Sequence, residues 1–290
     1  MRFAAAISKV VLWLATTVAL AVAVPAAWTQ LHVVDADGYA AMAQKAARDP
    51  ALQSAMAAEL SARALALVAA RGGGHYPVDS SQVHEAVAAF TAGPSFPPLF
   101  AQANRAAHAW LFTDARPDQN SNQWLVDVAP MFNDSSIQQQ LRRYDVKVPA
   151  TVMVPITVPS IPESLRQGQL SRLSTWGPWV STGAAAVSGF CASLMLVAAR
   201  RRGKALTGLG VSVLLIGAAG WAGIEIGGRY VNDALNRTTG DIRRIADVMV
   251  SYAEASLHQW FDFTLIAGAA LVVLGVLVAM LGSLFKKSVR

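Results

Sequence analysis

The sequence has few charged residues and a single cysteine. Asp, Glu, Lys and Arg make up 14% of the 290 residues, whereas a soluble domain averages about 25%. Hydrophobic residues make up 54%, and the mean hydropathy is +0.38. This composition excludes a purely soluble protein, because too few charged side chains remain to cover its surface. The single cysteine, Cys191, excludes an internal disulfide and a zinc site built from cysteines.

The sequence also lacks the motifs of common enzymes. It contains no phosphate-binding glycine loop, no paired-histidine zinc helix and no Gly-x-Ser-x-Gly nucleophile turn. His75, His84 and His108 could gather on a metal with Asp79 or Glu85, but their spacing matches no standard ligand pattern. We therefore expect no metal, no cofactor and no identifiable catalytic residue.

Four apolar stretches are long enough to cross a bilayer as helices, which takes about 20 residues each. They cover residues 10–28, 176–199, 205–226 and 263–285. The sequence thus predicts a mainly α membrane protein with four transmembrane helices. Its segments are a first helix (1–28), an extracytoplasmic domain (29–175), the second and third helices with a short basic turn (176–226), a second external helical segment (227–262), and the fourth helix with a basic tail (263–290).

The basic residues predict the orientation. Nine of them lie before the first stretch, between the second and third, or after the fourth, and all of these places face the same side of the predicted membrane. No Asp or Glu lies among them. The nine are Arg2, Lys9, Arg200, Arg201, Arg202, Lys204, Lys286, Lys287 and Arg290. The positive-inside rule places them and both termini in the cytoplasm. We expect a multi-pass protein of the cell membrane with its main domain outside. The formal net charge of +6 is then a sign of topology, and we expect no nucleic-acid partner.

The first apolar stretch has an alternative interpretation. A cleaved signal peptide would use Arg2 and Lys9 as its basic region and Val24-Pro25-Ala26 as its cleavage site. The length of the stretch and the interfacial position of Trp28 favour an uncleaved helix. Either interpretation leaves the sidedness of the rest unchanged.

The large external segment contains signals for helices and for a minor β element. Asp49-Pro50 predicts a helix start, with the helix continuing to about Arg71, and Asp79 predicts a second one ending at Gly93-Pro94. Further helices are expected over 98–113 and 135–144 and from residue 160. Alternating apolar residues predict strands over 124–128 and 151–158. We expect a mostly helical domain with a minor β element.

The second external segment carries an apolar stripe at helical spacing. Its members are Ile242, Ile245, Met249 and Tyr252. The stripe either packs on the first external domain or lies on the lipid surface. Acidic neighbours favour the first alternative, because they would be repelled by anionic headgroups.

Small residues in the apolar stretches predict helix contacts, because they let helix backbones approach closely. The positions are Gly189 in the second stretch, Gly223 and Gly227 at the end of the third, and Gly268, Gly275, Ala279 and Gly282 in the fourth. They serve packing within the four-helix bundle or association with another membrane protein.

Four polar residues are candidates for a functional cleft: His84, His108, Asp127 and Glu225. Glu225 is the only acid inside a proposed span, and intramembrane carboxylates are functional candidates. It lies at the outer end, however, with Arg229 and Asp233 one and two turns later. An interfacial ladder of ion pairs is the better explanation.

Short motifs in the external domain point to a protein group. Asp49-Pro50-Ala51-Leu52-Gln53, Ala107-His108 and Val126-Asp127-Val128-Ala129-Pro130 resemble landmarks of actinobacterial four-helix integral membrane proteins that carry a large extracytoplasmic domain after the first helix. The resemblance covers most of the chain in layout and only short motifs in residues. It implies an envelope location and this architecture, and no activity or catalytic residue.

The sequence favours a non-enzymatic envelope protein whose external domain binds or positions a partner, either another envelope or membrane protein or a second copy of the chain. The alternative is an enzyme or carrier that acts on envelope lipid or glycan at the outer leaflet. A third possibility, an oligomeric channel or transporter, has the least support, because the apolar stretches contain no other acid.

Overall fold

The computed structural model describes residues 2–70, 79–113, 123–127, 138, 153–157, 168, 170–199, 202–236 and 240–287. The chain divides into two compact units. Unit 1 comprises Met1–Leu31, Thr175–Tyr230 and Glu254–Arg290, and unit 2 comprises His32–Ser174 and Val231–Ala253. The described residues are almost entirely helical.

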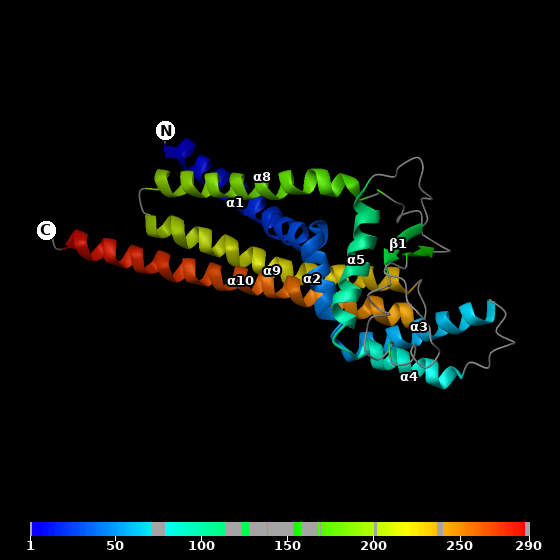
Figure 1. The fold of residues 1–290 in the computed structure, drawn as a ribbon. Coiled ribbons are helices and arrows are strands. Elements are labelled where there is room, and N and C mark those ends of the chain that lie inside the picture. Colours follow the sequence, from blue (N-terminus) through cyan, green and yellow to red (C-terminus); the bar gives the residue numbers. More distant parts are fainter. Residues whose placement is uncertain are drawn as a thin grey trace. The chain divides into compact units, whose positions relative to one another are not determined.

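Four long helices build unit 1 (Figure 1): α1 (Arg2–Thr29), α8 (Ser171–Ala198), α9 (Arg202–Leu235) and α10 (Gly240–Lys287). Each contains a stretch long and apolar enough to span a membrane, with mean hydropathies of 2.2, 1.7, 1.8 and 2.7 in chain order. The protein is therefore of the multi-pass membrane type, and the four predicted helices are confirmed.

Two of these helices are much longer than a bilayer is thick. At about 1.5 Å per residue, α9 and α10 extend roughly 51 and 72 Å, against about 30 Å of hydrocarbon. Residues 231–235 of α9 and 240–253 of α10 accordingly belong to unit 2. The segment 227–262, predicted to be helical, is helical over nearly all of its described residues. It consists of the continuing ends of the two helices, and α10 begins at Gly240, whose φ of 67° favours glycine.

The other described helices of unit 2 follow one another closely in the chain. A five-residue π-helix, η1 (Gln30–Val34), continues α1 and leads to α2 (Ala36–Ala46), α3 (Pro50–Ala70), α4 (Ser80–Thr91) and α5 (Phe96–Phe112). The predicted starts of α3 and α4 are confirmed: the Asp49 carboxylate accepts a hydrogen bond from the Ala51 amide, and Asp79 accepts one from Ser81, each 2.8 Å long. The third predicted helix begins two residues earlier than expected.

An apolar cluster joins α2, α3, α4 and α5 with the part of α10 that belongs to unit 2. Ala46, Ala47, Leu52, Phe90 and Phe96 are buried at its centre. Partly buried side chains of α10 pack against it: Ile245, Val248, Met249 and Tyr252. Three members of the predicted stripe, Ile245, Met249 and Tyr252, thus pack on this cluster as expected, whereas the fourth, Ile242, is 46% exposed.

Two short strands pair antiparallel: β1 (Gln123–Asp127) and β2 (Met153–Thr157). They coincide with the two alternating runs in the sequence. Pro155 of β2 lies opposite Leu125 of β1, and a proline is tolerated there because both strands of a two-stranded ladder are edges. The expected helices over 135–144 and from residue 160 lie outside the described residues, apart from residues 138, 168 and 170.

Candidate functional site

His108 on α5 is buried, whereas His84 and Glu225 are exposed. Its side chain is 5% exposed, and Nε2 lies 2.9 Å from the carbonyl oxygen of Val33. Because a carbonyl only accepts, Nε2 carries a proton and donates. The imidazole also stacks on Phe112, with 4.1 Å between ring centroids, and lies 5.4 Å from the Tyr39 ring. His108 is thus held in the interior of unit 2 by one bond and two rings.

The geometry at the end of α1 explains why the Val33 carbonyl needs this donor. Val33 lies in the π-helix η1, which ends at Val34. The next residue, Asp35, caps the start of α2. The Asp35 carboxylate accepts the Gly38 amide at 2.7 Å, so that amide cannot bond back to Val33. The imidazole of His108 therefore satisfies a carbonyl left over at a helix end.

Polar neighbours of His108 bond mainly to one another. The Tyr39 hydroxyl lies 3.5 Å from Oδ1 of Asn104, and burial raises the pKa of Tyr39. Arg105, one turn before His108, forms a 2.8 Å ion pair with Asp37. These contacts fasten α5 to α2 and leave no acid directly on the imidazole.

The other three candidates lie on three different elements. His84 on α4 is exposed, with Nδ1 3.4 Å from the Ser61 hydroxyl. Asp127 ends β1. Glu225 is exposed on α9 in unit 1. No contact between His84 and His108 is found among the described residues, and the cleft that the sequence suggests stays a prediction.

Glu225 differs from the sequence-based prediction in a second way. Within the described part of α9 it forms no ion pair with Arg229 or with Asp233, and all three side chains are exposed. The predicted ladder of ion pairs is wrong. Charged side chains four residues apart gain little from pairing at an exposed surface, so water competes successfully.

The described residues contain no group of three His, Cys, Asp or Glu side chains that could hold a metal ion. His75, one member of the suggested histidine set, lies outside these residues. Asp79, another possible ligand, caps α4 and bonds to Ser81, which lowers the pKa of its carboxyl.

A surface hollow in unit 2 was not foreseen from the sequence. Its volume is about 430 Å³, and it is lined by Gln44, Arg48, Gln53, Ala92, Gly93, Pro94, Pro97 and Pro98. The turn between α4 and α5 supplies one wall, and the end of α2 and start of α3 supply the other. Clustered prolines and a glycine at residues 93–98 are the signal that could have suggested an irregular, concave surface there.

Glycines join α9 to α10 in unit 1. A Cβ added at Gly203 would lie 2.6 Å from the Ala279 amide nitrogen, and one at Gly275 would lie 2.5 Å from the Thr207 amide nitrogen. A Cβ at Gly268 would lie 2.8 Å from the Leu214 amide nitrogen. Gly268, Gly275 and Ala279 therefore lie at a close helix contact, as the sequence predicts for packing positions.

The partners on α9 were missed by sequence reasoning. They are Gly203, Gly210 and Gly217, spaced seven residues apart, together with Gly220, which lies beneath the Phe261 ring. A Cβ at Gly210 would lie 2.7 Å from the Val272 amide nitrogen, and one at Gly217 would meet the Leu265 side chain. The seven-residue spacing was the signal that could have identified them.

The remaining predicted packing positions behave differently. At Gly189, Gly223 and Gly227 an added Cβ would meet nothing within 4 Å in the described structure. These three glycines make no close helix contact within the described residues, so for them the alternative of association with another membrane protein stays a prediction. The side-chain surroundings of Gly282 lie outside the described residues.

Hydroxyl and indole groups link α1 to α9. Trp13 Nε1 donates to the Gly208 carbonyl at 3.2 Å, and the Thr17 hydroxyl bonds to the Ser212 hydroxyl at 2.8 Å. Because four residues on α1 correspond to four residues on α9, the two helices run parallel. Ser212 is fully buried; its hydroxyl donates to the Gly208 carbonyl at 3.2 Å and accepts from Thr17, so both helices share one buried polar contact.

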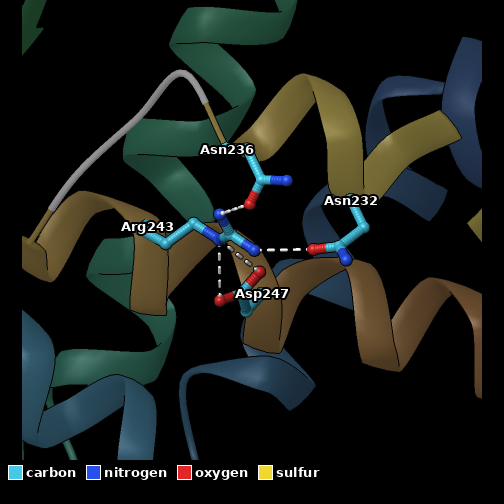
Figure 2. Close-up of polar contacts among 4 residues, drawn as sticks. All are labelled: Asn232, Asn236, Arg243 and Asp247. Carbon is cyan, nitrogen blue, oxygen red and sulfur yellow. Dashed lines mark hydrogen bonds and ion pairs between the residues drawn. The ribbon is translucent and has the colours of Figure 1, made fainter. Parts of the chain in front are cut away.

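One arginine closes the turn between α9 and α10 (Figure 2). Nε of Arg243 donates to both Asp247 carboxylate oxygens, at 3.0 and 3.1 Å. Its two terminal nitrogens donate to the side-chain oxygens of Asn236 at 2.7 Å and Asn232 at 2.6 Å. A single guanidinium thus fixes the last turn of α9 to the first turns of α10, a geometry that a lysine could not reproduce.

Aromatic and polar side chains meet where the apolar part of α10 begins. Trp221 Nε1 on α9 donates to Asp262 at 3.0 Å, and its ring lies 4.1 Å from the His258 ring. Trp28 Nε1 on α1 donates to the Ser256 hydroxyl at 3.2 Å. Trp221 is 40% exposed and Trp28 is buried, and tryptophans are enriched where a helix crosses a membrane interface.

Comparison with known proteins finds no matching protein family, no matching curated protein and no matching solved structure. The resemblance to actinobacterial four-helix proteins therefore stays a prediction from short motifs.

Proposed function

We propose that this chain is a non-enzymatic membrane protein of the cell envelope whose unit 2 lies outside the cytoplasm and binds or positions a partner protein. The separation of nine basic residues from all acidic ones supports this sidedness. The contribution of α10 to the core of unit 2 supports a domain built onto the membrane helices.

The observation that carries the proposal is the hollow between α2, α3 and the α4–α5 turn. Its proline wall offers apolar contacts, and Gln44, Arg48 and Gln53 offer hydrogen-bonding groups. Such a mixture of an apolar surface and a few polar groups is typical of a binding site. The lining contains no carboxylate and no histidine, so its chemistry suits recognition.

Affinity capture of the full-length chain from its native membrane tests the proposal. Ala92 lies exposed in the lining, and Ala92→Trp would fill the hollow with a large side chain. Ala62 is exposed on α3 outside the lining, so Ala62→Trp is the matched control. We expect a stoichiometric partner with the wild type and with Ala62→Trp, and loss of that partner with Ala92→Trp.

Two outcomes would count against a binding domain. If Ala92→Trp retains the partner in full, the hollow is not the docking surface. If His84→Ala or Asp127→Asn abolishes function in cells while protein level and partner recovery are unchanged, the alternative of an enzyme or carrier acting on envelope lipid or glycan gains the support instead.

A further inference from the structure

The first turn of α9 alternates between buried and exposed residues. Gly203 and Ala205 are buried, while Arg202 and Lys204 are exposed. Neither exposed cation forms an ion pair within the described residues. The close contact between Gly203 and Ala279 fixes the backbone of this turn against α10. The two cations are therefore presented outward from a fixed position.

The same end of unit 1 gathers further positive charge. Since α9 and α10 run antiparallel, the chain before Gly203 and the part of α10 after Ala279 lie at the same end. Lys286 and Lys287 follow Ala279 on α10 by about two helical turns, roughly 10 Å. The nearest acids along the two helices are Glu225 and Asp262.

Apolar side chains adjoin these charges. Leu281 on α10 is 55% exposed, and Val278 and Leu277 are exposed one turn earlier. A surface that combines an outward cationic turn with an exposed apolar helix matches a molecule that has an anionic head and an apolar tail. Free phosphate would match only the first part.

We infer that this basic end of α9 and α10 binds the headgroup of an anionic phospholipid, with the acyl chains lying along the exposed apolar side chains of α10. Each basic residue close to an anionic lipid surface changes affinity by about fivefold. Removing two of them should thus weaken binding by about 25-fold. The inference concerns unit 1 alone and holds for either orientation in the membrane.

The experiment is a lipid titration of the detergent-purified full-length chain, read by native mass spectrometry. Phosphatidylglycerol and phosphatidylcholine are compared as probes, with and without excess inorganic phosphate. The test variant is Arg202→Gln/Lys204→Gln. The matched control Lys45→Gln/Arg229→Gln removes the same charge at exposed positions elsewhere, and Arg202→Lys/Lys204→Arg keeps the charge in place.

We expect the wild type to retain phosphatidylglycerol in preference to phosphatidylcholine, and the test variant to lose about 25-fold in that affinity. The control and the charge-keeping variant should match the wild type, and excess phosphate should not displace the lipid. Equal retention of both lipids, or an equal loss in the control, would overturn the inference. Displacement by phosphate would also overturn it, because the site would then recognise a soluble anion.

Discussion

At the scale of single residues, His108 stabilises the fold through its hydrogen bond to Val33 and the packing of its ring on Phe112 and Tyr39. We predict that His108→Leu destabilises the protein by about 1–3 kcal/mol, because the partly buried Val33 carbonyl would lose its donor. His108→Gln keeps an amide donor and should cost less. Thermal unfolding of the detergent-purified chain, followed by helical circular dichroism, measures both. Equal effects of the two variants would show that packing of the side chain matters and the hydrogen bond does not.

The capping carboxylate of Asp79 predicts how the stability of the protein depends on pH. Hydrogen bonds from the Ser81 hydroxyl and amide hold the pKa of the Asp79 carboxyl below its ordinary value. A lowered folded-state pKa stabilises the folded protein above the unfolded-state pKa, and this stability is lost as the pH falls through the folded-state value. The unfolding temperature of the wild type should therefore exceed that of Asp79→Asn above about pH 5, and the gap should close below about pH 4. A gap that stays constant down to low pH would refute the charged cap.

These residue-scale features differ in how well the sequence predicts them. The caps at Asp49 and Asp79 depend on a few neighbouring residues, so their positions could be read directly. The burial of His108 depends on Val33 and Tyr39, which are far away in the chain. The Glu225 ladder shows the opposite error, since favourable spacing along a helix does not guarantee that exposed charges pair.

At the scale of elements, the α9–α10 contact distinguishes two kinds of glycine. Gly275→Leu should lower the unfolding temperature, because its side chain would collide with the Thr207 backbone and force the helices apart. Gly189→Leu on α8 meets open space and should leave the unfolding temperature unchanged or slightly higher, given the better helix propensity of leucine. Both variants are compared in the same detergent.

The result also bears on association with a partner. If both variants unfold at the same temperature, the glycine contact between α9 and α10 does not stabilise the fold. If Gly189→Leu unfolds normally but no longer recovers a membrane partner, its open position is an intermolecular surface. Small residues four apart predict a close contact, but they cannot tell which helix, or which molecule, occupies it. This is why the sequence could mark Gly268 and Gly275 as contact positions, but could not tell that Gly223 and Gly227 make no close contact within the described residues.

At the scale of the whole molecule, sidedness can be measured with cysteine labelling in a Cys191→Ala background. Ser121→Cys should react with an impermeant thiol reagent in intact cells, because residues 29–175 are predicted to lie outside. Lys204→Cys should react only after the membrane is opened. Lys204 suits this purpose because its side chain is exposed, whereas Gly203 is packed against α10 and would not tolerate a side chain. The reverse labelling pattern would refute the predicted orientation.

The number and approximate bounds of the membrane helices were predictable, because hydropathy over about 20 residues reflects the cost of burying polar groups in lipid. The continuation of α9 and α10 into unit 2 was not, because polar residues in a helix look the same whether water or a second domain surrounds them. The Arg243 contacts with Asn232 and Asn236 illustrate this point, since a turn separates the partners and only the folded chain brings them together.

The glycine contact between α9 and α10 also constrains how the gene for this protein can change. One residue inserted between Gly210 and Gly217 would rotate every later position of α9 by about 100°. Gly217 and Gly220 would then turn away from Leu265 and Phe261, and larger side chains would take their places. Related genes should therefore tolerate substitutions on the outward faces of these helices, yet keep the residue count between the contacting glycines unchanged.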